Sequence, residues 1–262
     1  MFICAAEKDV SLNEKELIAA FPLIIFDHAI AQEVLVNISS VFHTRRYYVM
    51  KIRKIKDRGV LFTHSNPGWD LNVYLIMGRK CNYIIDTGLG SLSIDPIKDY
   101  IKNDNKKTVV INTHYHWDHV WGNGSLKDCI IISHKLCREM IQSKWEEMIE
   151  KNNQYRYGEV EIYLPNLVFE KELYFPEDKI KLFYTPGHTL DSISVIDEKE
   201  KVLLVGDNIG ESIEDIVPSI YCEKDVYINT MKEYEKMDFD TCISGHNTIQ
   251  KKEVIGRILS MM

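Results

Sequence analysis

Short apolar, β-branched runs bounded by glycine and polar residues recur along the chain from Met50 onward. Runs of this kind predict β-strands, and in the first half we expect them at residues 60–64, 72–77, 82–86, 108–113 and 129–133. The second half repeats the pattern at residues 167–175, 179–184, 192–196, 201–205 and 241–244.

Apolar residues at helical spacing alternate with these runs. They predict helices over residues 93–103, 136–152, 225–237 and 251–259. Strands dominate each half of the chain, and helices intervene or follow. This order predicts an α+β fold in which two sheets pack together with helices outside.

The first 49 residues do not continue the pattern. Residues 11–14 have the spacing of a capping box, which predicts one or two helical turns over residues 14–20, but no clear period follows Pro22. Met50 begins the regular series of strands and would make a natural start for a chain of this kind. We therefore expect residues 1–49 to be an appended extension or the product of an upstream start codon, and residues 50–262 to form the functional domain.

The densest chemical signal is the run from His114 to His119, which reads His-Tyr-His-Trp-Asp-His directly after the predicted strand 108–113. Three of the nine histidines of the chain fall within these six positions. Imidazole nitrogens and carboxylate oxygens are the ligands that zinc and similar divalent cations take. The run therefore predicts a metal site at a strand end.

Three later motifs share the same local design. His188, Asp207 and His246 each come shortly after a predicted strand and directly beside a glycine that allows a tight turn. If these loops converge with the His114–His119 run, they assemble five histidines and two aspartates, too many for one tetrahedral zinc and suited to two. A structural zinc is disfavoured, because closed structural sites favour cysteine and only Cys242 lies near these loops.

Charge and composition narrow the partners. The net charge of −7 disfavours a nucleic-acid partner, with the basic stretch 45–58 as the one counter-indication. No apolar run reaches the roughly 18 residues of a membrane span, no secretory leader is recognisable, and the six cysteines are scattered without a CxxC pair. We expect a cytoplasmic protein with reduced thiols that acts on a small-molecule substrate, away from membranes.

From about Met50 to its C-terminal end, the chain resembles the metallo-β-lactamase superfamily of hydrolases. The residues that carry the resemblance are, in order, Asp86-Thr87-Gly88, the His114–His119 run, His188, Asp207 and His246. The resemblance implies a four-layer αββα sandwich with a dinuclear metal site at one edge.

The resemblance also implies a role for each of these residues. The first metal would be held by His114, His116 and His188. The second would be held by Asp118, His119 and His246, and Asp207 would bridge the two. Asp86 would orient a ligand through hydrogen bonds.

The chemistry implied by the resemblance is hydrolysis. Two zinc ions, with iron or manganese as the other candidates, would share a hydroxide that attacks an ester-like bond. Asp118 would orient this hydroxide and pass its proton to the leaving group, which makes it the candidate catalytic residue.

The sequence specifies the branch of the superfamily less closely than it specifies the fold and the metal ligands. Asp207 and the lack of a recognisable leader disfavour an exported antibiotic-hydrolysing enzyme. Glyoxalase II shares the seven ligands, but its basic and aromatic glutathione-binding segment has no counterpart after Asp207. The acyl-homoserine lactonases place a tyrosine where this chain has Gly210. We predict a thioester or lactone substrate, with a phosphodiesterase or an iron-containing redox or ligand-sensing protein as the alternatives.

Aromatic residues interleave the predicted site loops. Trp69, Trp117, Trp121 and Tyr221 are candidate walls of an apolar substrate pocket, and packing against helices is the competing interpretation. His64 lies in a polar segment that could border the same pocket, whereas His28, His43 and His134 are expected to have ordinary structural roles.

Overall fold

The computed structural model describes residues 36–37, 49–66, 68–210, 212, 215–246 and 249–262, which all fall in the compact unit Glu33–Met262. The predicted capping box and the helical turns at residues 14–20 lie outside the described residues, as do His28 and His43.

The first sheet contains eight described strands in chain order: β1 (Val36–Asn37), β2 (Val49–Ile55), β3 (Gly59–Asn66), β4 (Trp69–Met77), β5 (Cys81–Ile85), β6 (Lys107–Ile111), β7 (Ile130–His134) and β8 (Leu167–Phe169). Strands β1 to β5 are antiparallel, and β5 to β8 are parallel. Parallel neighbours need crossovers, and helices α2 (Ser91–Ile101) and α4 (Lys135–Asn152) lie in two of them. The carboxyl ends of β5, β6 and β7 therefore point to one edge.

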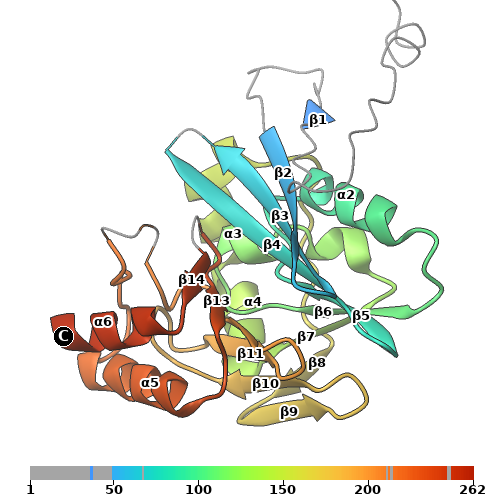
Figure 1. Ribbon diagram of the computed structural model, residues 1–262. Helices are drawn as coiled ribbons and strands as arrows, with labels where there is room; N and C mark the ends of the chain where they lie inside the picture. The colour runs from blue at the N-terminus through green and yellow to red at the C-terminus, as the bar shows by residue number, and fades with distance from the viewer. Residues whose placement is uncertain (1–35, 38–48, 67, 211, 213–214, 247–248) are drawn as a thin grey trace, which may run out of the picture. The chain divides into compact units, whose positions relative to one another are not determined.

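The second sheet contains six described strands in the order β14 (Ile249–Lys251), β13 (Thr241–Ile243), β12 (Val202–Leu204), β11 (Ile193–Asp197), β10 (Ile180–Tyr184) and β9 (Glu172–Phe175). Only β12 and β13 pair in parallel among these strands, and helix α5 (Lys224–Lys236) lies in the connection between them. Helix α6 (Glu253–Met261) follows β14 and lies beside α5 (Figure 1).

An apolar core joins the two sheets. Ile76 and Ile111 of the first sheet and Leu182 and Val195 of the second belong to one cluster of buried side chains, each fully or almost fully removed from solvent. Burial on this scale is the main favourable term in folding. This core lies between the two sheets, which are the two inner layers of the sandwich.

Helices cover the outer face of each sheet. Ile94 and Ile97 of α2 pack with the outer face of the first sheet, and Tyr227 and Met231 of α5 pack with that of the second. The arrangement is a four-layer αββα sandwich, as the sequence predicted (Figure 1).

One predicted element was wrong. The run 167–175 is not one strand: β8 pairs with β7 in the first sheet, whereas β9 pairs with β10 in the second. An apolar run predicts a strand but does not show which sheet its two ends join. The helix predicted over residues 251–259 is present as α6, shifted by two residues, and the short strand β14 that precedes it and pairs with β13 was not predicted.

Two predictions made from composition can be followed in the structure. The described cysteines, Cys81, Cys129, Cys137, Cys222 and Cys242, are all free thiols, as predicted. Among the described residues, every helix is too short or too polar to cross a bilayer.

Candidate metal centre

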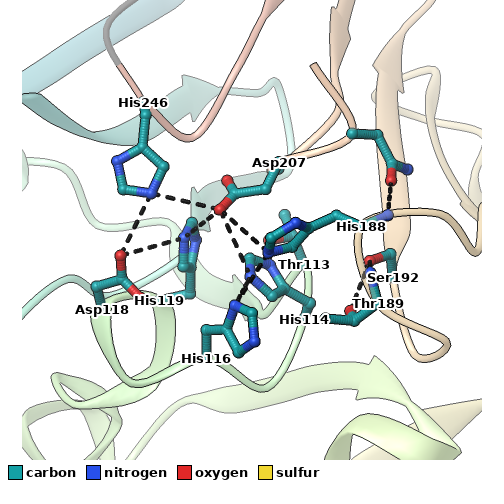
Figure 2. Close-up of polar contacts among 12 residues, drawn as sticks. Thr113, His114, His116, Asp118, His119, His188, Thr189, Ser192, Asp207 and His246 are labelled. Atoms are coloured by element: carbon teal, nitrogen blue, oxygen red, sulfur yellow. Dashed lines mark hydrogen bonds and ion pairs between the residues drawn. The ribbon is translucent and has the colours of Figure 1, made fainter. Parts of the chain in front are cut away.

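The polar loops with the predicted ligands all begin where a strand ends. Asp86 follows β5, and the His114–His119 run follows β6 in the first sheet. In the second sheet, His188, Asp207 and His246 follow β10, β12 and β13. Figure 2 shows that the side chains from these separate loops point toward a common centre.

Backbone contacts fasten the last of these loops to the first sheet. Leu71 of β4 forms an isolated β-bridge with His246, and the Asn72 amide donates to the Gly245 carbonyl oxygen at 2.7 Å. The Asn72 side-chain amide donates to the Ser244 carbonyl oxygen at 3.0 Å. His246 is therefore held in place from both sheets.

Three histidines form the first group of potential ligands together with Asp207. The ligand atoms of His114, His116, His188 and Asp207 all lie within 4.8 Å of one another. The His116 Nδ1 atom is 3.1 Å from the Nε2 atoms of both His114 and His188. Three imidazole nitrogens that meet in this way suit one cation between them.

Asp118, His119 and His246 form the second group, with ligand atoms also within 4.8 Å of one another. The Asp118 Oδ2 atom is 3.3 Å from the His246 Nε2 atom and 3.8 Å from the His119 Nε2 atom. Asp118 and His119 belong to the short helix α3 (Trp117–Val120), which turns the chain directly after the His114–His116 segment.

One carboxylate oxygen lies between the two groups. The Asp207 Oδ2 atom is 3.7 Å from the Nε2 atom of His114 and 3.8 Å from that of His188. The same oxygen is 3.4 Å from the Nε2 atom of His119 and 3.3 Å from that of His246 (Figure 2). Asp207 is thus the side chain that both groups share.

Outer hydrogen bonds orient the imidazoles. The Nδ1 atom of His188 donates to the Ser219 carbonyl oxygen at 2.7 Å, and that of His246 donates to the Asp70 carbonyl oxygen at 3.0 Å. A carbonyl oxygen can only accept, so Nδ1 is the nitrogen that carries the hydrogen whenever either ring is neutral. Burial alone would lower the pKa of His246, but the nearby carboxylates of Asp207 and Asp118 raise it well above its usual value. In the neutral ring, the Nε2 lone pair is left free to bind a cation.

Asp86, for which the family resemblance implies a ligand-orienting role, lies beside the His114–His119 run. Its backbone has a φ of 63°, in the left-handed region, and its carboxylate accepts hydrogen bonds from the Thr113 amide at 2.7 Å and the Thr113 hydroxyl at 2.8 Å. The His119 Nδ1 atom lies 2.8 Å from the same carboxylate. Asp86 therefore aims the Nε2 atom of His119 at the centre and ties the β5 and β6 loops together.

The donor set fits two divalent cations. Among the described residues, the His119 Nε2 and Asp207 Oδ1 atoms are buried without a hydrogen-bond partner. Unsatisfied buried polar atoms are costly, and a bound ion is one explanation for them. Two adjoining His/Asp groups that share one carboxylate are consistent with a dinuclear site of mixed imidazole and carboxylate ligands.

The electrostatics favour ligand-competent protonation states in the first group. Burial, with the neighbouring His188 adding to it, lowers the pKa of His116 to about 4. Burial and the nearby His119 also hold the pKa of His114 well below its usual range. Burial alone would raise the pKa of Asp207, but the facing His119 and His246 hold it well below its ordinary value. The carboxylate is therefore ionised at neutral pH.

A cavity of about 520 Å³ opens over both groups, and the candidate aromatic residues differ in their relation to it. Trp117 and Tyr221 line it, as predicted. Trp121 does not, because its side chain is fully buried against Cys137 and Ile141, where α3 packs on α4. Trp69 stands behind the lining, with its ring centroid 6.1 Å from that of Trp117 and 5.7 Å from that of His246.

His64 does not border the cavity either. Its side chain is fully buried beside Tyr157, with the ring centroids 6.2 Å apart, and burial lowers its pKa to about 4. A polar neighbourhood in the sequence did not reveal that β3 directs this residue inward. The His134 ring stacks on the Tyr184 ring with the ring centroids 4.3 Å apart, in keeping with the structural role expected of His134.

Residues of α4 were not recognised from the sequence as part of the site. Lys144, Glu147 and Lys151 line the same cavity as the metal-ligand groups. Their spacing along the helix was a possible signal, but charged residues at this spacing usually mark an exposed helix face. Only the fold shows that this face borders a cavity.

The comparisons with known proteins agree with this geometry. Residues 67–246 match the family model of the metallo-beta-lactamase superfamily, and the chain belongs to this family. The structure of the DIM-1 metallo-beta-lactamase is similar in fold, with a TM-score of 0.63 and 17% identity over 80% of this chain and 95% of that one.

Relatives in sequence carry several names. The chain is 24% identical to the Beta-lactamase-like protein 2 homolog of Caenorhabditis elegans, over 79% of this chain and 67% of that protein. It is 30% identical to the atrochrysone carboxyl ACP thioesterase of Aspergillus chevalieri, over 60% of this chain and 47% of that protein. It is 25% identical to the N-acyl homoserine lactonase of Bacillus cereus, over 79% of this chain and 94% of that protein.

Proposed function

We propose that this protein is a metal-dependent hydrolase that cleaves a small ester-like bond, either a thioester or a lactone. The observation that supports this most strongly is the Asp207 Oδ2 atom, which lies 3.3 to 3.8 Å from four imidazole nitrogens drawn from both ligand groups. Such a shared carboxylate suits a pair of cations, for which we propose zinc.

The chain's own residues have separate tasks in this proposal. His114, His116 and His188 would hold one cation, Asp118, His119 and His246 the other, and Asp207 both. When bound, two such cations lower the pKa of water toward neutrality and polarise the substrate carbonyl. Trp117 and Tyr221 form cavity walls beside the reacting bond.

Asp118 is the proposed proton carrier. Its side chain is buried, and although burial raises its pKa, the neighbouring His119 and His246 lower it to below the usual value. The Oδ2 atom is therefore an ionised acceptor at neutral pH. It would take the proton of the attacking water and deliver it to the departing sulfur or oxygen.

The names of the relatives support an ester-like bond over a phosphodiester. One relative is named as an ACP thioesterase and another as a lactonase. A third, from Francisella philomiragia, is named as a hydroxyacylglutathione hydrolase and is 27% identical over 54% of this chain and 50% of that protein. The net charge of −7 also offers no general attraction for a polyanion.

A substrate panel on metal-loaded protein tests the proposal. We expect purified protein to bind two zinc ions per chain, to hydrolyse thioesters or lactones, and to lose and regain activity as zinc is chelated and restored. Bis-p-nitrophenyl phosphate should be a poor substrate. Protein that takes up no metal, or that cleaves only the phosphodiester, would overturn the proposal. Redox-active iron without esterase activity would instead favour an oxidoreductase.

Replacing Asp118 with alanine is expected to reduce kcat by at least about 100-fold, the usual range for loss of a general acid–base group. The fold should remain, since Asp118 lies on a short helix at the cavity and not within a sheet core. Steady-state kinetics and circular dichroism measure the two effects. Wild-type kcat in this variant would refute the role.

A further inference from the structure

One part of the cavity lining is a stripe of helix α4. Lys144, Glu147, Met148, Lys151 and Asn152 all line the cavity. They fall at positions i, i+3, i+4, i+7 and i+8 of the helix, so they share one face. Seven residues of helix place Lys144 and Lys151 about 10 Å apart along the axis.

This stripe carries more positive than negative charge. The Glu147 carboxylate pairs with both lysines, at 3.1 Å from the Lys144 Nζ atom and 2.7 Å from the Lys151 Nζ atom. Glu147 is the one acidic residue among these five lining residues of α4, so the stripe itself carries a net positive charge. The chain as a whole carries −7, which makes this stripe unlike its general surface.

The three side chains are also placed to reach a ligand. Their exposed fractions are 48% for Lys144, 46% for Glu147 and 67% for Lys151. Pairs this exposed contribute little to stability, so the row is not explained by a need to hold the fold. Exposed ammonium groups can instead exchange Glu147 for an incoming anion.

Apolar side chains also contribute to the lining of this cavity. Tyr115, Trp117 and Met148 line the same cavity. Trp117 stacks on Tyr155 with the ring centroids 5.1 Å apart, which fixes its ring. A cavity of about 520 Å³ is large enough for an extended small molecule with an apolar middle section.

We propose that Lys144 and Lys151 bind an anionic group of the substrate, a carboxylate or a phosphate, which is located at a distance from the scissile bond. The inference rests on the proposed function, because the scissile bond must lie at the His/Asp groups for α4 to meet the far end of the molecule. Glu147 then acts as an internal competitor that pairs with the two ammonium groups until the anion replaces it. The substrate class is therefore an anionic ester or thioester.

Matched substrates test this inference. The first pair is the S-adipyl thioester of N-acetylcysteamine and its methyl ester, which differ only in the charge at the far end of the acyl group. The second pair is S-acetyl-4′-phosphopantetheine and S-acetylpantetheine, which differ only in the phosphate on the leaving group. Binding of the corresponding thioethers, with a methylene in place of the carbonyl, is measured by calorimetry and does not depend on turnover.

Three variants complete the design. In the Lys144→Gln/Lys151→Gln double variant, we expect kcat/KM and affinity for the anionic member of one pair to fall about tenfold, or about 1.4 kcal/mol. The neutral member should change less than about twofold. Glu147→Gln should raise affinity for the anionic member. Lys135→Gln is the control, since this lysine is on the same helix, 54% exposed, and paired with Glu170 away from the cavity lining.

The outcomes separate the inference from the proposed function. The pair that responds to the double variant shows whether the anion belongs to the acyl group or to the leaving group. Hydrolysis of neutral thioesters with no preference for charge in either pair would overturn the inference and leave the proposed function standing. Lysine-dependent thioether binding without hydrolysis of any ester would support the inference and overturn the proposed function. An equal loss on charged and neutral ligands would also overturn the inference.

Discussion

Asp207→Asn is expected to reduce the metal content from two ions per chain to one or fewer and to lower kcat/KM by about 100-fold or more. The substitution keeps the size of the side chain and removes its negative charge. It therefore acts on the one oxygen that lies within 3.8 Å of imidazole nitrogens from both ligand groups. Losing a ligand that both cations share should cost more than losing a ligand to one of them.

Metal analysis by mass spectrometry and steady-state kinetics measure this effect. Asp238→Asn is the matched control, because its side chain is 81% exposed and forms a surface pair with Lys201. The control should keep two metals and full activity. An Asp207→Asn protein with two bound metals and wild-type kinetics would contradict the sharing of this carboxylate.

Arg58→Ala is expected to lower the free energy of unfolding by about 3–5 kcal/mol, the range for breaking a buried ion pair from one side. Arg58 and Asp197 are 8% and 2% exposed. The Arg58 Nε atom donates to the Asp197 Oδ2 atom at 2.8 Å, and its Nη2 atom donates to the Asp178 carbonyl oxygen at 2.8 Å. The pair joins the β2–β3 turn of the first sheet to the end of β11 in the second.

Urea unfolding of the metal-free protein measures this loss without a contribution from bound cations. Arg58→Met/Asp197→Asn should recover part of it, since it leaves no unpaired charge while the asparagine can still accept from the Glu200 amide, as Asp197 does at 3.0 Å. Lys201→Ala, which breaks an exposed pair, should cost less than about 1 kcal/mol. A loss as small for Arg58→Ala would show that the buried pair does not fasten the sheets.

The sequence allowed the ligand loops to be predicted because their chemistry and their position are both local. His188, Asp207 and His246 each follow an apolar strand and adjoin a glycine. Strand ends collect at the edges of sheets, so the strand pattern made it possible for these residues to meet, and the family resemblance implied that they do. The four-layer arrangement came from the family resemblance, and the structure has it.

Features that depend on tertiary packing were not predictable in the same way. Trp121 and Trp117 are separated by one helical turn, yet one is fully buried under α4 and the other lines the cavity. His64 is directed inward by its place on β3. The lysine row on α4 has the pattern of an ordinary exposed helix face until the neighbouring loops are known. In each case the deciding fact is which element packs above the residue.

Because the His246 loop is attached to β4, the complete set of proposed cation ligands forms only when the two sheets are joined. His114, His116, Asp118 and His119 leave the ribosome early, whereas Asp207 and His246 emerge only after most of the second sheet has been made. A partly synthesised chain has an incomplete set of donors and can hold a cation only weakly. Tight uptake of the proposed cations would thus require a chain in which both sheets have formed, and their binding free energy would add to the stability of the joined sheets.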